Sequence, residues 1–600
     1  MRREPHVGSR YPRYKPSPHY LPIRELVKRG ISEQPKDRDA PVQDDVVEVR
    51  GRVTNKTMLS DKLYFFDLEE NHHRIQIMYD HRKIPWGPQK RDFDAHLSEV
   101  KTGDYISARG IPGTSEKKRT LLVIADQLPV RYSQSLVPLP KGFLDEGTRA
   151  KKRHLELMVN KRATDTLRLR ARILSSIRHF LDGLDFTEVQ TPLLAADAGG
   201  AVARPFVTES TELRKRQLAL RVAPELWLKR LVIGSMERVY ELGPAFRNEG
   251  VDATHNPEFT TCEFYAAFWT LDDLMRQTES LVHRLALSTD EFVRSRPATS
   301  KNEQSNEITP PETSLYRGAY PRIEFIPALQ KAMGFSLPPL SAPTARDDLA
   351  KLLGEKSISL GDEPMASLSL PKILDRLAAK YLEPFFKQSL KPVFLFHHPE
   401  CMAPLAKSFV CPATKQVVSA RAELYLAGTE VANMYEEEND PVEQRAKLER
   451  QAALHANPDG PSVIDEGYLN ALEAGLPPTG GWGCGVDRLV MHFALAEKIS
   501  EVLAFGNLRQ VVALHRDSPS PTRRGDETAS PADGKKDTTK DRKPSPVTIH
   551  YVLSGYQQGG PEAAAHGVAV GVDAEKSAEN SAQGGQGKEV GVTNIQGKKW

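Results

Sequence analysis

Residues 238–268 read RVYELGPAFRNEGVDATHNPEFTTCEFYAAF, and this stretch decides the fold of the central part of the chain. Apolar and polar residues alternate in two runs, Val239–Leu242 and Phe259–Tyr265, around a loop rich in Arg, Asn, Glu and His. Alternation predicts a β-hairpin, and one face of its second strand would carry Phe259, Thr261, Glu263 and Tyr265. Ionic groups on a buried sheet are costly unless paired. The hairpin therefore carries either a functional polar site or a structural network of ion pairs.

The sequences on either side of the hairpin predict further elements of the same domain. Upstream, apolar residues recur at helical spacing between Leu169 and Leu181 and predict a helix that ends near Gly183. The following FTEVQTPLL (186–194) predicts a strand that stops at Pro192, because proline cannot donate to a sheet ladder. Downstream, GWGCGVDRLVMHFA (481–494) has GxGxG spacing, which does not fit the GxGxxG loop of dinucleotide-binding folds.

Closer to the N-terminus, five short alternating runs between Val46 and Val137 predict a small closed β-barrel. An oligonucleotide-binding (OB) barrel has this number of strands, and it binds single strands with aromatic and basic side chains. Arg52, Phe65 and Gln76 are candidates for such contacts. The alternative is that Phe65 and Phe66 only alternate between the surface and the core of the barrel.

Length and composition set outer limits on the protein. The chain has 600 residues, 27% of them charged, with a formal net charge of +3, so any nucleic acid must be held by local basic patches. No run approaches the roughly 18 apolar residues of a membrane span. Four cysteines, far apart in the sequence and without CxxC spacing, argue against a disulfide framework or a zinc site.

Composition also suggests the domain boundaries. Residues 1–45 begin with a basic segment and are expected to be either a disordered arm that touches RNA phosphates or an organellar transit peptide. The barrel would occupy 46–137 and the catalytic domain 138–515, with a polar inserted loop near 296–315. The tail from 516 to 600 is poor in apolar residues and predicted to be disordered.

The motifs of the central domain resemble those of class II lysyl-tRNA synthetases. FRNEG, THNPEFT and CEFY resemble the second class II motif in its lysine-specific form, while the segments around 181–194 and 481–494 resemble the first and third motifs. The likeness runs from Val46 to Arg509 and includes RVAPELWLKRLVIG (221–234) and GGAVARPF (199–206). It implies an α+β fold, with an OB-fold barrel followed by an antiparallel catalytic sheet flanked by helices. It also implies a homodimer that uses ATP and Mg²⁺ to attach L-lysine to tRNA(Lys).

The resemblance also implies roles for individual residues. Arg247 and Arg488 would be catalytic, holding the α-phosphate and the γ-phosphate of ATP, since a planar guanidinium suits an anion better than an ammonium does. Further contacts to ATP would come from Glu249, His255, Asn256, Phe259 and Glu423. Lysine would contact Glu225, Arg247, Glu263, Tyr265, Asn433 and Glu437. The Mg²⁺ ligands would be Glu423 and Glu430, and the anticodon would meet Phe65 and Gln76.

The sequence departs from the family pattern in a few places. Family members commonly have arginine where this chain has Thr57 or Met58, and glutamate where it has Thr120, so anticodon discrimination is expected to be looser or differently built. The closing FPxxRP segment appears here as FGNLRQ (505–510), which keeps Arg509 and loses both prolines. With the basic N-terminus, these departures suggest a fungal mitochondrial form located in the matrix, with the cytoplasm as the alternative.

Three other functions compete with this interpretation. A scaffold protein descended from a synthetase would have lost the phosphate and magnesium ligands, which are present here. A ligase that acts on a protein acceptor usually lacks the barrel. Aspartate or asparagine specificity is the nearest rival among enzymes, and such a pocket would present cations or amides in place of acids.

Overall fold

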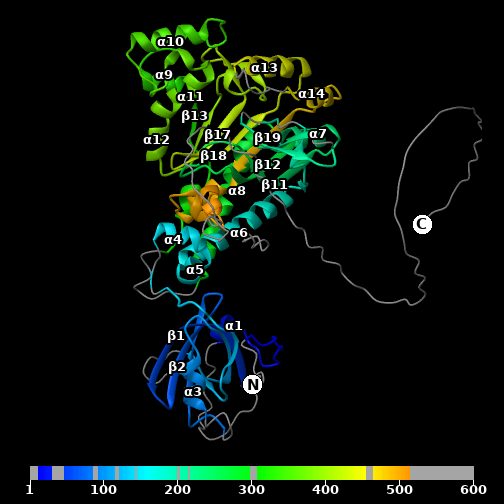
Figure 1. Ribbon diagram of the computed structural model, residues 1–600. Helices are drawn as coiled ribbons and strands as arrows, with labels where there is room; N and C mark the ends of the chain where they lie inside the picture. The colour runs from blue at the N-terminus through cyan, green and yellow to red at the C-terminus, as the bar shows by residue number, and fades with distance from the viewer. Residues whose placement is uncertain are drawn as a thin grey trace, which may run out of the picture. The chain divides into compact units, whose positions relative to one another are not determined.

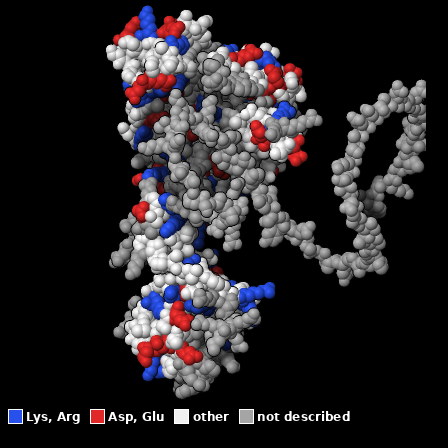
Figure 2. All heavy atoms as spheres, in the orientation of Figure 1, with Lys and Arg blue, Asp and Glu red and all other residues white. Residues whose placement is uncertain are grey.

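The computed structural model describes a defined subset of the chain (Figure 1), namely residues 11–29, 46–85, 92–114, 121–140, 142, 145–196, 199–200, 203–213, 216–296, 307–454 and 464–513. The predicted tail, Thr120 and residues 297–306 of the predicted loop lie outside these residues. On the face drawn in Figure 2, basic and acidic side chains are interspersed. In the described part of the chain, no helix is long and apolar enough to cross a membrane.

The N-terminal part of the chain forms a six-stranded sheet with the order β1-β2-β3-β5-β4-β6. Its strands are β1 (Val47–Ser60), β2 (Leu63–Glu70), β3 (His73–Asp80), β4 (Tyr105–Thr114), β5 (Leu121–Ala125) and β6 (Val130–Ser133). Because β1 pairs with β4 as well as with β2, five strands form a closed circuit of pairings. Side chains of β2 alternate, with Phe66 in the core and Phe65 outside it. Helix α3 (Phe93–Glu99) adds Phe93 and Leu97 to this core.

A short N-terminal helix, α1 (Ile23–Arg29), packs against this sheet. Ile23 and Leu26 are buried in its core, and the Tyr20 hydroxyl donates to Glu70 Oε1 at 2.6 Å. The Arg50 guanidinium lies 3.3 Å from the centroid of the Tyr20 ring. The prediction of a disordered basic arm is wrong for residues 20–29, which form part of this folded unit because they supply apolar side chains to it. The alternative, a transit peptide, stays a prediction.

The central domain is built on an eight-stranded sheet with the order β13-β14-β17-β18-β19-β12-β11-β7 (Figure 1). Its strands are β7 (Thr187–Glu188), β11 (Arg238–Phe246), β12 (Glu258–Ala267), β13 (Arg322–Glu324), β14 (Val393–Phe396), β17 (Arg421–Leu426), β18 (Thr429–Glu436) and β19 (Thr479–Gly485). The predicted hairpin is confirmed as β11 and β12, which pair antiparallel from Arg238↔Ala266 to Phe246↔Glu258. Only the two edge pairs, β13–β14 and β7–β11, are parallel among the described pairings of this sheet.

Three helices pack into the main core of this sheet: α6 (Lys161–Asp182), α8 (Leu271–Arg294) and α15 (Val486–Ala494). The helix predicted to end near Gly183 is confirmed as α6, and Leu169, Ile173 and Ile177 on its apolar face are fully buried. Phe264 of β12 stacks on Trp482 of β19, with 4.9 Å between ring centroids. The strand predicted to run up to Pro192 is shorter than expected, because β7 covers only two residues. These elements confirm an α+β architecture.

A second core lies beside β14 and contains helices α9 (Phe325–Met333), α10 (Ala345–Glu355), α11 (Leu370–Tyr381) and α12 (Glu383–Gln388). Residues 307–315, predicted to belong to a surface loop, are partly internal, because Ile308 is buried in the main core. The hydroxyl of Tyr316, next in the chain, forms a hydrogen bond with His492 Nε2 at 2.8 Å. Further elements include α4 (Glu146–Lys151), α5 (Arg153–Val159), α7 (Glu225–Ile233), α13 (Pro441–Leu454), α14 (Glu466–Leu472), α16 (Ile499–Val502), α17 (Leu508–Ala513), β8 (Leu194–Ala195), β9 (Val207–Ser210), β10 (Arg216–Leu220), β15 (Ser408–Val410) and β16 (Val417–Ser419).

The cysteines are free thiols, as the sequence predicted. Two of them are nevertheless close in space, because Cys262 of β12 lies directly opposite Cys484 of β19 in the ladder. Both side chains are buried, and burial raises the pKa of each thiol above its usual range. Separation along the sequence therefore did not predict separation in the sheet.

Candidate active site

A cavity of about 1490 Å³ opens on the large sheet between β12, β18, β19 and the N-terminus of α7. Phe259, Thr261, Glu263 and Tyr265 all line it, which confirms that this face of β12 looks into one space. Eleven of the residues predicted to bind lysine, ATP or magnesium line the same cavity: Glu225, Arg247, Glu249, His255, Asn256, Phe259, Glu263, Tyr265, Glu430, Asn433 and Arg488. The hairpin thus belongs to a site able to hold a large ligand.

Three buried acids that are far apart in the sequence lie near one another, two of them lining this cavity, and we call Glu225, Glu263 and Glu437 the acid cluster. Their exposed fractions are 5%, 8% and 1%, so almost no bulk water screens their charges. Burial and the nearby Glu225 raise the pKa of Glu263 to about 8, against the opposing effect of Arg247 and Arg221. Concentrated, poorly hydrated acids of this kind favour a cationic ligand.

Lys229, one turn after Glu225 on α7, already occupies part of the acid cluster. Its Nζ lies 2.6 Å from Glu225 Oε1 and also forms an ion pair with Glu437. The Tyr435 hydroxyl donates to the same Glu225 oxygen at 2.6 Å. Glu437 itself does not line the cavity. It lies behind Gly481, where an added Cβ would fall 1.9 Å from Glu437 Oε1, so glycine at this position leaves space for the carboxylate.

Arg247 follows β11 and lines the cavity. Its guanidinium carbon lies 5.1 Å from the centroid of the Phe259 ring, a cation–π arrangement. Among described residues, its guanidinium donates one long hydrogen bond, 3.5 Å from Nε to the Val222 carbonyl. A guanidinium that has so few protein partners and lies beside the Phe259 ring is suited to bind an anion that is attached to a planar ring.

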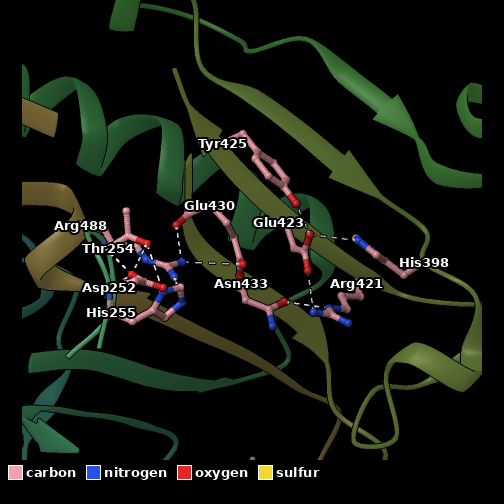
Figure 3. A network of polar contacts seen from close by, with 10 residues as sticks. All are labelled: Asp252, Thr254, His255, His398, Arg421, Glu423, Tyr425, Glu430, Asn433 and Arg488. Carbon is pink, nitrogen blue, oxygen red and sulfur yellow. Dashed lines mark hydrogen bonds and ion pairs between the residues drawn. The ribbon is translucent and has the colours of Figure 1, made fainter. Parts of the chain in front are cut away.

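The opposite side of the cavity holds a polar network (Figure 3). Arg488 Nη2 donates to His255 Nε2 at 2.7 Å, and His255 Nδ1 lies 2.9 Å from Asp252 Oδ2. These partners define the tautomer of His255, with its proton on Nδ1. Arg488 Nη1 also donates to the backbone carbonyl of Glu430 at 3.0 Å. The network therefore fixes a second guanidinium at the cavity wall.

Glu423 and Glu430, the predicted metal ligands, have different surroundings. Glu423 Oε1 accepts a hydrogen bond from Arg421 at 2.6 Å and Oε2 accepts one from Tyr425 at 2.9 Å, while His398 Nε2 lies 3.2 Å from Oε2. Glu423 does not line the cavity, whereas Glu430 does, with 40% of its side chain exposed. Burial and the charge of Glu423 raise the pKa of Glu430 to about 7.

This pair fits a magnesium ion only if substrate oxygens complete the coordination. In the described ranges no group of three Asp, Glu, His or Cys side chains could hold a metal by itself. Mg²⁺ commonly takes one or two carboxylates together with phosphate oxygens. Glu430 faces the cavity and suits a direct ligand, whereas both oxygens of Glu423 accept hydrogen bonds from Arg421 and Tyr425.

The central domain matches the family model described as tRNA synthetases class II (D, K and N) over residues 145–509. The mitochondrial lysine–tRNA ligase of Schizosaccharomyces pombe is 40% identical over 469 residues, which cover 77% of this chain and 84% of the relative. The chain belongs to the lysine–tRNA ligase family of class II tRNA synthetases. The mitochondrial enzyme of Saccharomyces cerevisiae is 36% identical over 77% of this chain and 81% of its own length. A probable cytoplasmic lysine–tRNA ligase of Encephalitozoon cuniculi is 35% identical over 82% and 93%.

Within this class II synthetase, most of the site residues predicted for lysine and ATP line the cavity, but the sequence did not predict the groups that hold them. Lys229 and Arg421 were not predicted as part of the site, although each is ion-paired with a predicted residue. The i,i+4 spacing of Glu225 and Lys229 on a helix was a visible signal for one contact. Asn256 was predicted to contact ATP, and both ends of its amide are already bonded, to the Glu258 carbonyl and the Leu508 N–H.

The N-terminal sheet of the synthetase presents the two predicted anticodon residues on its outer side. Phe65 and Met78 are direct neighbours across β2 and β3, as are Asp67 and Gln76. Gln76 Nε2 donates to Asp67 Oδ1 at 3.0 Å, which fixes the orientation of the amide. Arg52 instead bonds within the sheet, to the Gly103 carbonyl and the Tyr105 hydroxyl at 3.1 Å each.

Proposed function

We infer that this chain is a lysine–tRNA ligase, which activates L-lysine with ATP to lysyl-adenylate and transfers it to tRNA(Lys) in translation. The observation that carries this function is that Glu225 and Glu263 of the acid cluster line the same cavity as Arg247. Acids offset the cost of desolvating ammonium groups, and the arginine accepts anions. A pocket for aspartate would need cations around the substrate side chain, and a pocket for asparagine would need amides.

We propose the following placement of lysine and ATP. Glu225 takes the α-ammonium of lysine, and Glu263, Tyr265, Asn433 and Glu437 form the surroundings of its side-chain ammonium. Arg247 lies between the lysine carboxylate and the α-phosphate, where it offsets the repulsion of two anions that must approach each other. Arg488 faces the γ-phosphate, and the Phe259 ring lies against adenine, with His255, Glu249 and Asn256 around it.

Bound Mg²⁺ would draw charge from the phosphates of ATP and help orient them. Glu430 and Glu423 are its proposed ligands. The role of the chain's own residues is to hold the lysine carboxylate and the α-phosphate in contact, since correct positioning removes much of the entropic barrier to their reaction.

The amino-acid specificity can be tested by ATP–pyrophosphate exchange with each of the twenty amino acids and magnesium. Exchange is expected with lysine, with other amino acids at least about tenfold weaker in kcat/KM. Exchange with aspartate or asparagine but not with lysine would reject the proposed function.

The raised pKa of Glu263 predicts a pH-dependent affinity for lysine. Below its pKa of about 8 the carboxyl is protonated and neutral, and a neutral group cannot offset an ammonium. The charged groups that surround it are Glu225, Arg221 and Arg247, and the neutral hydroxyl of Tyr265 lies within hydrogen-bonding distance. The KM for lysine is therefore expected to fall as pH rises from 6 to 8, by up to about tenfold per pH unit, and to level off above 8.

The measurement is the KM for lysine in pyrophosphate exchange across this pH range at saturating ATP. The KM for ATP, measured in parallel, serves as the control. In Glu263→Gln the KM for lysine should be higher and should lose this dependence on pH. A KM for lysine in the unmodified enzyme that stays constant from pH 6 to 8 would contradict the prediction.

We propose that the closed N-terminal circuit of strands is an OB-fold domain for the anticodon, spanning residues 46–137. Residues 138–515 would then form the catalytic domain, and 516–600 a separate tail. Phe65 offers a stacking face for the central base, and Gln76 offers an amide whose NH₂ group is engaged by Asp67. Thr57 and Met58, where family members commonly carry arginine, support looser discrimination.

Replacing Phe65 with alanine is expected to raise the KM for tRNA(Lys) roughly tenfold, because stacking contributes about 1–3 kcal/mol per base. The measurement is aminoacylation of transcripts with the natural anticodon and with a substituted central base. Val130→Ala, a change at an exposed residue of β6, is the control. If Phe65→Ala charges both transcripts as the unmodified enzyme does, the anticodon role of this face is wrong.

We also propose a homodimer and a mitochondrial matrix location. The exposed apolar side chains of the segment that resembles the first class II motif and its neighbours support the dimer: Leu193, Leu194, Val207 and Leu213. The basic N-terminus supports the location, although α1 limits a removable leader to residues before the Tyr20–Arg29 segment. A reporter fused to residues 1–45 is expected to accumulate in mitochondria, and a diffuse cytosolic signal would contradict this.

A further inference from the structure

Lys229 has its ammonium group fully enclosed by protein. Its side chain is 0% exposed and is paired with Glu225 and Glu437. Burial opposes the charge, but these two carboxylates raise the pKa of Lys229 above its usual value, so the group stays an ammonium. Three aromatic rings surround Nζ at 5.6–6.0 Å from their centroids, those of Tyr265, Tyr435 and Tyr468. A cation therefore lies permanently inside the acid cluster.

Lys229 alone does not balance the acid cluster in its ionised form, which a bound ammonium favours. With all three acids ionised, their three negative charges exceed the single positive charge of Lys229 by two. Lysine as a substrate brings two ammonium groups, and its carboxylate is directed to Arg247. The filled site is then neutral among the acids, Lys229 and the two ammonium groups. Buried charges are tolerated only when they are balanced in this way.

The hydrogen bonds of Glu225 point to the same conclusion. Its Oε1 accepts from both Lys229 and the Tyr435 hydroxyl, each at 2.6 Å. No described residue donates a hydrogen bond to Oε2, and Glu225 lines the cavity. Lys229 therefore holds one oxygen of this carboxylate in place, and the other stays available to a ligand.

We propose that Lys229 is a positioning residue for amino-acid recognition, which compensates Glu437 and orients Glu225 so that the acid cluster matches a substrate with two ammonium groups. The inference rests on the proposed lysine specificity. It differs from a purely structural ion pair in what it predicts for paired substitutions. A structural pair would affect stability, whereas a compensating charge also sets the affinity for lysine.

The test compares three variants of the full-length chain in pyrophosphate exchange: Lys229→Met, Glu437→Gln and the double variant. Each single change leaves one unbalanced charge in the filled site. It is expected to raise the KM for lysine about tenfold, with the KM for ATP and kcat changed less than about threefold. The double variant restores the balance, and its KM for lysine is expected to be lower than that of either single variant.

If the two single effects multiply, so that the double variant has a KM for lysine raised about a hundredfold, the proposal is overturned. A Lys229→Met variant with an unchanged KM for lysine would also overturn it. If Lys229→Met does not fold, comparison of the double variant with Glu437→Gln alone still decides: a lower KM in the double variant supports compensation, and an equal or higher KM overturns it. An unmodified enzyme without lysine-dependent exchange would refute the proposed function instead.

Lys447 offers a matched control. It is also a buried lysine, 4% exposed, and its Nζ lies 2.7 Å from the buried carboxylate of Glu438, outside the acid cluster. Lys447→Met is expected to lower the thermal midpoint while leaving the KM for lysine within about twofold. A KM raised as much as in Lys229→Met would show that loss of any buried lysine near this site has the same effect, and would overturn the proposal.

Discussion

Replacing Arg247 with lysine is expected to lower kcat for lysine-dependent pyrophosphate exchange by about 10²–10³-fold, equivalent to about 2.7–4 kcal/mol of transition-state stabilisation. The reaction joins two anions, so the cation between them acts most strongly when they are closest. The guanidinium of Arg247 donates a single long hydrogen bond to described residues, so its other donors remain available to substrates. A lysine ammonium could neither bridge two anions with a planar fork nor lie over Phe259 in the same way.

The measurement is steady-state exchange with lysine and ATP varied separately. Arg445→Lys is the matched control, because Arg445 is exposed and its guanidinium pairs with Glu466 at 2.6 Å on α13 and α14. That variant should keep its activity, since an exposed ion pair contributes little. A kcat for Arg247→Lys within threefold of the unmodified enzyme would remove Arg247 from the proposed mechanism.

Replacing Arg221 with methionine is expected to lower the free energy of unfolding of the central domain by about 3–5 kcal/mol. Arg221 is 3% exposed, and its Nη1 lies 2.5 Å from Glu241 Oε1. It also donates to the Pro244 carbonyl at 2.8 and 2.9 Å and to Thr191 Oγ1 at 2.9 Å. The substitution would leave Glu241 buried without its counter-ion, and a lone buried charge is more costly than the pair.

Urea unfolding followed by tryptophan fluorescence measures this loss. Arg178→Met removes an arginine from the half-exposed pair with Glu188, where the side chains are 39% and 37% exposed, and should change stability by less than about 1 kcal/mol. If Arg221→Met and Arg178→Met lower the free energy of unfolding by the same small amount, the buried network around Arg221 does not stabilise the packing of β11 against the segment that precedes it.

The parts of the fold that could be predicted were those encoded by local periodicity. The buried face of α6 and the cavity face of β12 follow from spacings of 3.6 and 2 residues, and both are confirmed. The two-residue length of β7 could not be predicted, because it depends on its parallel pairing with β11. The sequence also did not predict which strands pair across the sheet, because no residue near Cys262 specifies that Cys484 lies opposite it.

The site shows the same division. Residue types at motif positions predicted which side chains face the cavity, including Arg247 and Glu430. They did not predict that Glu437 would be enclosed behind Gly481, or that Lys229 would reach it, because these contacts arise only when α7 packs against the sheet at β11 and β12. Second partners of charged groups are a property of packing, so a single sequence does not specify them.

The enclosure of Lys229 among the carboxylates of the acid cluster also limits how the cavity can distinguish one ligand from another. A homologue of lysine shortened by one methylene carries the same two positive charges, and the acid cluster attracts both molecules equally. In the proposed placement of lysine, discrimination between the two molecules must then depend on the distance between the carboxylates of Glu225 and Glu263. One methylene changes the free energy of discrimination by about 1–3 kcal/mol. Diamino acids that differ from lysine by one methylene are therefore expected to be the substrates that this enzyme rejects least well.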